Sequence, residues 1–124
     1  MEEIYQEYII ELYKNPRNYG EIPDSERAEV SNPTCGDRIT LFLKIRDGIV
    51  QNAKFTGHGC AISQASASLF TGFIRGKSLE ELSGVGKEDV LSLLRIDLSR
   101  NPTRMRCALL PLDALKKLLK DVLP

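Results

Sequence analysis

The chain has 124 residues, of which 42% are hydrophobic, and its 17 Lys and Arg balance its 17 Asp and Glu. This length predicts one domain, spanning residues 1–124, with one modest core. Zero net charge gives no overall field that favours nucleic acid or an anionic membrane, so we expect neither as a partner. Residues 1–37 hold nine acids against three bases, which leaves open an acidic docking face for a protein or an ordinary solvated surface.

The apolar pattern and the cysteines indicate a compartment. No apolar run approaches the length of about 18 residues that a membrane span needs, and the acidic start Met1-Glu2-Glu3 is unlike that of a secretory leader. We therefore expect a cytoplasmic protein. In that reducing compartment, the three cysteines are better explained as metal ligands or reactive thiols than as disulfides.

The first part of the chain predicts a helix, a turn and a loop. Apolar residues recur at three- and four-residue spacing over residues 2–14, which favours an amphipathic helix. Pro16 should end this helix, and residues 15–20 have the composition of a turn. We expect a polar loop over residues 21–27 and a short edge strand over residues 28–32.

Residues 38–56 give the clearest strand signal, a β-hairpin with one buried face. The odd-numbered residues from Ile39 to Ile45 are apolar and alternate with mostly polar ones. Asp47-Gly48 alone could form a two-residue turn, but that register mixes the two faces. A three-residue loop over residues 46–48 pairs 45 with 49, 43 with 51, 41 with 53 and 39 with 55. We expect this loop, with Gly48 left-handed, because it aligns the apolar sets.

Helices should follow the hairpin. After a glycine-rich turn at residues 57–60, we expect a helix over residues 63–75. Its first half is nearly all small residues, which permits a close approach to a sheet or a loop. Ser78 and Glu81 have the spacing of a capping box, which predicts a short helix ending near Gly84.

The last part of the chain is also expected to be helical. Residues 87–94 predict one short helix. Asn101 and Pro102 fit the cap and the first position of another, which would carry Cys107 on its second turn. Pro111 should break or kink this helix, and an apolar stripe continues beyond it to the end.

Three cysteines and one aspartate stand where metal ligands would be expected. Cys35 and Asp37 flank a glycine just before a predicted strand, and Cys60 lies at the exit of the same hairpin, so both loops should fall at one end of the sheet. Cys60 also precedes a helix N-terminus and Cys107 lies near two arginines, and both settings favour a thiolate. Three soft ligands and one hard one form a four-coordinate set for zinc or an iron–sulfur cluster.

A carboxylate among thiolates would change how firmly such a site holds a soft metal. Four thiolates hold zinc or iron tightly, whereas an oxygen ligand weakens the site and leaves one exchangeable position. A purely structural site gains nothing from such a position, but a site that must release its cargo does.

Other interpretations of the same residues remain open. The cysteines could be small buried hydrophobic residues, and no Cys-x-x-Cys pattern of a zinc ribbon is present. Asp37 could be an ordinary turn or cap acid. His58, the single histidine, could complete a site near Cys60 or simply face solvent. No Ser-His-Asp set, phosphate-binding glycine loop or paired carboxylate site stands out.

The chain resembles the IscU/NifU/SufU family of iron–sulfur cluster scaffold proteins. The resemblance covers most of the chain and rests on several motifs in the same order: residues 13–20 (YKNPRNYG), 32–37 (NPTCGD), 57–68 (GHGCAISQASAS) and 101–107 (NPTRMRC). It implies an α+β fold with a three-stranded antiparallel sheet and helices packed on it. It also implies a site for a [2Fe–2S] cluster or Zn²⁺ built from Cys35, Asp37, Cys60 and Cys107.

Two departures from the IscU-type pattern concern the subtype. IscU-type members have a histidine immediately before the last cysteine, whereas this chain has Arg106, as SufU-type members do. The Leu-Pro-Pro-Val-Lys stretch through which IscU-type scaffolds engage a dedicated Hsp70 chaperone is replaced by residues 100–104 (RNPTR), so we do not expect that partner. SufU-type members carry a longer insertion between the last two cysteines than the 46 residues found here.

The resemblance implies one of two related functions, cluster assembly or sulfur transfer. In the leading hypothesis the protein is a scaffold rather than an enzyme: it accepts sulfur from a cysteine desulfurase, assembles a [2Fe–2S] cluster with iron and passes it to recipient apo-proteins. The alternative is a zinc-dependent sulfurtransferase, and a third, weaker reading is a structural zinc module. Cys35 is our candidate for the persulfide acceptor, with Cys107 as the alternative.

Overall fold

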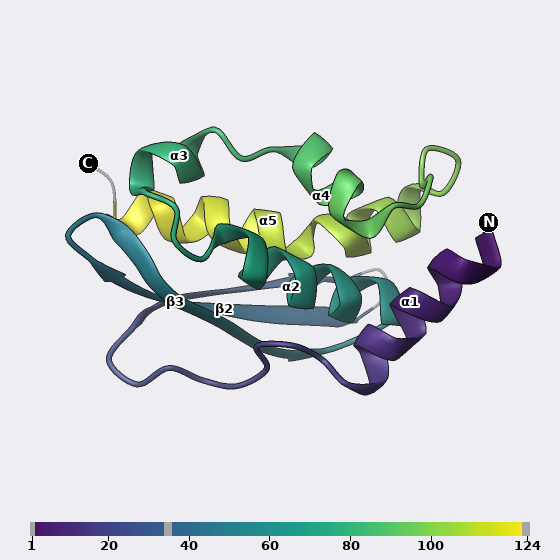
Figure 1. Ribbon diagram of the computed structural model, residues 1–124, viewed down its shortest axis with the longest axis horizontal. Helices are drawn as coiled ribbons and strands as arrows, with labels where there is room; N and C mark the ends of the chain where they lie inside the picture. Colours follow the sequence, from purple (N-terminus) through teal and green to yellow (C-terminus); the bar gives the residue numbers. More distant parts are fainter. Residues whose placement is uncertain (1, 34–35, 123–124) are drawn as a thin grey trace.

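The computed structural model describes residues 2–33 and 36–122, with side chains from residue 7 onward. Within these residues, three antiparallel strands in the order β1-β2-β3 form a sheet, and helices cover it, as Figure 1 shows. The predicted α+β fold is thus confirmed. The elements are α1 (Glu2–Lys14), β1 (Glu26–Asn32), β2 (Asp37–Arg46), β3 (Ile49–His58), α2 (Ala61–Ile74), α3 (Leu79–Ser83), α4 (Lys87–Leu94) and α5 (Pro102–Val122).

The core lies between the sheet and the pair α2 and α5, which run side by side across one face of it (Figure 1). Leu41 of β2, Phe70 of α2 and Leu115 of α5 are all completely buried there. The small side chains in the first half of α2 are buried too, and the Ser66 hydroxyl donates a 2.6 Å hydrogen bond to the Ala108 carbonyl of α5. The expected close approach was to a sheet or a loop, whereas the neighbour that this hydrogen bond joins to the half-helix is another helix, α5.

The hairpin turn differs from the prediction. Arg46 pairs with Ile49, so the loop is the two-residue turn Asp47-Gly48, in which both residues have positive φ (54° and 74°). This geometry suits the right-handed twist of the flanking strands. The expected three-residue loop is wrong, because a shift in the strand register, and not the length of the loop, aligns the apolar residues of the two strands.

A β-bulge next to the turn aligns the apolar residues of β2 and β3. The register shifts between Lys44 and Ile45, and beyond the shift Leu43 faces Ala53 and Leu41 faces Phe55. An extra residue in one strand moves the following side chains to the opposite face. Val50, Ala53 and Phe55 of β3 consequently face the core, whereas Ile49, which the predicted register placed there, is 38% exposed.

Several element boundaries also differ from the prediction. β1 begins at Glu26, within the expected loop, because its pairing with β2 extends as far as Leu43. α2 begins at Ala61 rather than at residue 63. α5 continues through Pro111 as one element. Burial of its apolar residues on both sides of Pro111 outweighs the loss of one helical hydrogen bond, which costs about 3 kcal/mol.

The turn over residues 15–20 is fastened to the sheet and to α2. Asn18, with φ of 62°, accepts a 3.0 Å backbone hydrogen bond from Phe55 N–H and donates its side-chain amide to Thr71 at 3.1 Å. The Arg75 guanidinium donates to the Asn18 side-chain oxygen at 2.7 Å. These bonds fix the path that leads from α1 to the sheet.

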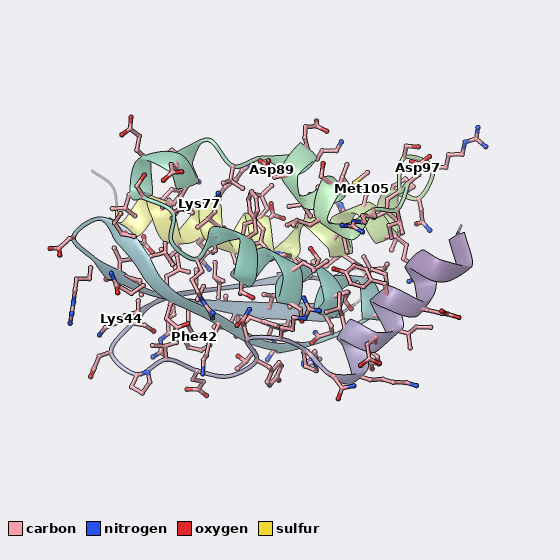
Figure 2. All side chains as sticks on the ribbon, in the orientation of Figure 1. Phe42, Lys44, Lys77, Asp89, Asp97 and Met105 are labelled. Atoms are coloured by element: carbon pink, nitrogen blue, oxygen red, sulfur yellow. The ribbon has the colours of Figure 1, made fainter. Side chains whose placement is uncertain are left out.

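The face of the sheet away from α2 and α5 is partly open. Figure 2 shows Phe42 and Lys44 on this side, whereas Asp89 and Met105 lie among the helices on the other. Phe42 is nonetheless only 2% exposed, because the Arg27 guanidinium lies over its ring at 4.9 Å. In the part of the chain that is described, every helix is too short or too polar to traverse a bilayer.

Candidate metal centre

Three side chains from three separate segments meet at one end of the sheet. They are Asp37, Cys60 and Cys107, whose ligand atoms all lie within 4.8 Å of one another. Asp37 begins β2, Cys60 precedes α2, and Cys107 lies on α5. A single ion or small cluster could therefore contact all three side chains.

Asp37 owes its place to the turn between β1 and β2. It pairs with Asn32 at the end of the β1–β2 ladder, and Gly36 N–H donates a 2.7 Å hydrogen bond to the Asn32 carbonyl across the turn. Its side chain is 3% exposed. A carboxylate this deeply buried requires strong polar or cationic neighbours to remain charged, which is what a metal ligand would have.

Cys60 occupies the N-cap position of α2. Its backbone N–H donates a 3.2 Å hydrogen bond to Asp37 Oδ1, and its carbonyl accepts a 3.0 Å bond from the Ser63 hydroxyl. The cap position leaves its side chain beside the positive end of the helix, where negative charge is stabilised. Cys60 is half-buried, whereas Asp37 and Cys107 are buried.

Gly59 makes the contact between Cys60 and Asp37 possible. Its φ of 151° is unfavourable for any other residue, and a Cβ at this position would lie 2.5 Å from Asp37 Cγ and Oδ1. The backbone of residue 59 therefore lies against the carboxylate because a side chain is absent.

Cys107 reaches the site from α5. The helix starts with Asn101, whose side-chain oxygen accepts a 3.1 Å hydrogen bond from Arg104 N–H, as the predicted cap should. Cys107 is 1% exposed, and the next residue, Ala108, is bonded to Ser66 of α2. The packing of α2 against α5 thus determines where this sulfur lies.

The donor set fits a thiophilic metal. Two thiols and one carboxylate converge in a largely buried space, and zinc and iron both accept sulfur together with oxygen ligands. In contrast, magnesium and calcium prefer ligand sets made of oxygen. A fourth protein ligand would complete a tetrahedral site.

The remaining predicted site residues are placed as follows. Cys35 lies outside the described residues, as does Thr34. His58 ends β3 and is exposed, and it is not among the residues that converge on the site. Arg104 and Arg106 are exposed on the surface of α5.

One buried polar residue beside the site was not predicted from the sequence. Gln64, in the first turn of α2, is 6% exposed. It stands within a run of small residues, a pattern that predicts only a close-packing surface. The signal that could have revealed it is a long polar side chain on a helix whose other residues at this end are all small or apolar.

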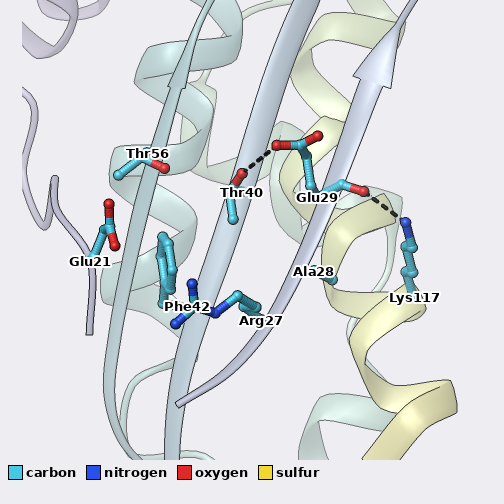
Figure 3. A pocket seen from close by; sticks show the side chains of 8 residues that line it. All are labelled: Glu21, Arg27, Ala28, Glu29, Thr40, Phe42, Thr56 and Lys117. Carbon is cyan, nitrogen blue, oxygen red and sulfur yellow. Dashed lines mark hydrogen bonds between the residues drawn. The ribbon is translucent and has the colours of Figure 1, made fainter. Parts of the chain in front are cut away.

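A separate hollow lies away from this site, on the open face of the sheet. It has a volume of about 490 Å³ and mixes acidic and basic side chains, as Figure 3 shows. Glu29 accepts a hydrogen bond from Thr40 through its carboxylate and from Lys117 through its backbone carbonyl. Since these two bonds already engage Glu29 and Lys117, and no thiol lines the hollow, we do not assign it a function.

Comparisons with known proteins show similarity over almost the whole chain. The family model described as NifU-like N terminal domain matches residues 4–123. The zinc-dependent sulfurtransferase SufU of Bacillus subtilis is 40% identical to this chain over 94% of the chain and 90% of its own length. The iron–sulfur cluster assembly scaffold protein IscU of Escherichia coli is 34% identical, over 94% of the chain and 92% of its own length.

Solved structures show the same fold. A protein of Fervidobacterium islandicum, described as an iron–sulfur cluster assembly scaffold for the SUF system, superposes with a TM-score of 0.80 at 30% identity, over 94% of this chain and 96% of the other. The N-terminal part of a NifU-like protein from Brucella abortus superposes with a TM-score of 0.81 at 23% identity, over 96% and 94% of the two chains, which shows the fold alone.

Proposed function

Since the chain belongs to the NifU-like N-terminal domain family, we propose that it accepts sulfur from a cysteine desulfurase, assembles a [2Fe–2S] cluster with iron and transfers that cluster to apo-proteins. The observation that supports this proposal most strongly is the convergence of Asp37, Cys60 and Cys107 within 4.8 Å. Iron and persulfide sulfur are here the substrates of the site, an external electron donor supplies the two electrons that convert each transferred sulfur to sulfide, and the cluster is the product.

We propose Cys35 as the fourth ligand. It stands two residues before Asp37 in the sequence, at the connection between β1 and β2. With it, the site would offer three thiolates and one carboxylate, which satisfies four-coordinate zinc or the protein-ligated corners of a [2Fe–2S] cluster.

Sulfur would enter by thiol–persulfide exchange. A cysteine thiolate of this protein attacks the terminal sulfur of the desulfurase persulfide, a new S–S bond forms, and the old one breaks to release the desulfurase thiolate. The terminal sulfur changes partner without any outside oxidant or reductant.

We propose that Cys35 is the acceptor in this exchange. Cys107 is only 1% exposed, so an incoming persulfide could not reach it unless α5 moved. Cys60 is half-buried, and its backbone is bound to Asp37. These restraints leave Cys35 as our candidate.

Asp37 would serve as the exchangeable ligand. A hard carboxylate oxygen binds iron or zinc less firmly than a thiolate does in a sulfur-rich site. Asp37 is 3% exposed, so this end of the sheet would have to open before a ligand of an incoming acceptor protein could replace Asp37 first, while the thiolates still hold the remaining corners.

A second function, zinc-dependent sulfur transfer, uses the same residues. It is favoured by the 40% identity to the Bacillus subtilis sulfurtransferase and by Arg106, which stands where IscU-type members have a histidine. In this version Zn²⁺ would be held by the same four residues and would organise the thiolates, while the acceptor cysteine relays a persulfide without cluster assembly.

Anaerobic reconstitution with iron, cysteine and a desulfurase distinguishes the two functions. We expect visible absorption of a transient cluster with matching iron and sulfide, and mass spectrometry should find persulfide on Cys35. Stoichiometric zinc without a cluster, together with faster desulfurase turnover, would support the sulfurtransferase instead. Persulfide on Cys107 alone would refute the assignment of Cys35.

A further inference from the structure

Gln64 has a buried amide nitrogen without a hydrogen-bond acceptor among the described residues. The residue is 6% exposed, and its Nε2 has no hydrogen-bond partner within the described part of the chain. Most buried amide groups in proteins are hydrogen-bonded, because an amide N–H that leaves water without a new acceptor is unfavourable. A hydrogen-bond acceptor on a bound metal centre would satisfy the Gln64 Nε2 group and remove this cost.

The position of Gln64 relates it to the metal centre. It follows Cys60 by four residues, so the two lie on the same side of α2, and Gln64 N–H donates a 3.2 Å hydrogen bond to the Cys60 carbonyl. Helical side chains lean toward the N-terminus and cover the preceding turn. The preceding turn is the one that starts at Cys60, whose N–H is bonded to Asp37.

The chemistry of the two groups is complementary. The occupied site would present anionic sulfur, as metal-bound thiolate or as sulfide, and such sulfur accepts hydrogen bonds. A carboxamide N–H donates without adding a charge, and outer donors of this kind orient ligands and tune the metal or cluster that they surround.

We propose that Gln64 is a positioning residue for this centre: its Nε2 donates a hydrogen bond to an anionic sulfur that the Asp37–Cys60–Cys107 site holds. This inference rests on the proposed function, because it requires that the site bind a metal through its thiolates. Gln64 itself is no ligand, and it acts on the bound sulfur from outside.

The test is the substitution Gln64→Met, which keeps the length of the side chain and removes the amide. Two effects of opposite sign are expected. The metal-free protein should melt about 2 to 6 °C higher, because an unsatisfied buried donor is gone. The Kd for Zn²⁺, measured by competition with a chelator, should rise about fivefold, the size of one neutral hydrogen bond.

Cobalt provides a spectroscopic readout of the sulfur itself. In Co²⁺-substituted protein, loss of a hydrogen bond to a thiolate should move the sulfur-to-metal charge-transfer band to lower energy. A residue that only supported the fold would leave this band in place. Gln51→Met, the same change at an exposed position on β3, is the control and should alter neither the band nor the Zn²⁺ affinity.

The outcomes separate this inference from the proposed function. If wild-type protein shows the thiolate–cobalt band and Gln64→Met binds Zn²⁺ equally well with an unmoved band, the role of Gln64 is refuted while the site stands. If wild-type protein shows no such band, the metal centre and the role of Gln64 both fall. Gln64→Leu serves as a second apolar variant, and its melting temperature and band should change in the same directions.

Discussion

Replacing Gly59 by alanine should reduce Zn²⁺ affinity at least about a hundredfold, which corresponds to about 2.7 kcal/mol of binding free energy. A methyl group at residue 59 would lie 2.5 Å from Asp37 Cγ and Oδ1, so the carboxylate must move away. Such a movement would also break the hydrogen bond from Cys60 N–H. The substitution thus displaces one ligand and releases the backbone of another.

Backbone strain at Gly59 is a separate effect and has its own control. The φ of 151° should cost alanine about 1 to 3 kcal/mol of folding free energy. Gly48→Ala also places alanine at positive φ, 74°, but a Cβ there has nothing within 4 Å. We expect Gly48→Ala to lower the free energy of unfolding while Zn²⁺ affinity stays within a factor of two or so.

Chelator competition and urea unfolding measure these two quantities. If Gly59→Ala bound Zn²⁺ with nearly wild-type affinity, the contact between residue 59 and Asp37 would be irrelevant to the metal. Gly48→Ala losing affinity to the same extent would show that strain alone explains the loss.

Replacing Asp37 by alanine should lengthen the lifetime of an assembled cluster at least about tenfold, equivalent to 1.4 kcal/mol in the barrier to release. At separations of 4.8 Å or less and an effective dielectric constant of about 20, a carboxylate and a thiolate repel each other by at least about 3.5 kcal/mol. Alanine removes this repulsion, and it removes the carboxylate that we propose as the exchangeable ligand.

Asp37→Asn is the matched variant. It keeps an oxygen that can accept the hydrogen bond from Cys60 N–H but loses the negative charge. If charge is the cause, both variants should release the cluster slowly to an apo-acceptor, measured by the decay of visible absorption. A cluster in Asp37→Ala that decays as fast as in wild-type protein would contradict the role assigned to the carboxylate.

The sequence predicted the end of the sheet at which the site lies, and for a physical reason. Antiparallel pairing brings the β1–β2 connection and the exit of β3 to the same end of the sheet. Asp37 and Cys60 were therefore expected to be neighbours once the strands were recognised. The predicted hairpin turn was wrong because a β-bulge shifts the strand register between Lys44 and Ile45. The alternation of apolar and polar residues alone cannot reveal such a shift.

The position of Cys107 could not be derived from local patterns. It depends on how α5 packs on α2 and on the bond from Ser66 to Ala108, which are long-range contacts. Only the resemblance to a known family placed it at the site beforehand. Neither local sequence patterns nor the family resemblance pointed to Gln64, because its burial and its unpartnered Nε2 are properties of the folded chain.

X-ray absorption spectroscopy at the zinc K-edge of the zinc-loaded protein tests the ligand set most directly. The ligands Cys35, Asp37, Cys60 and Cys107 predict three sulfur scatterers and one oxygen scatterer, and Asp37→Ala should remove the oxygen from this side chain without changing the number of sulfurs. Fewer than three sulfurs, or the multiple-scattering pattern of a histidine ring, would contradict a centre made of these four residues.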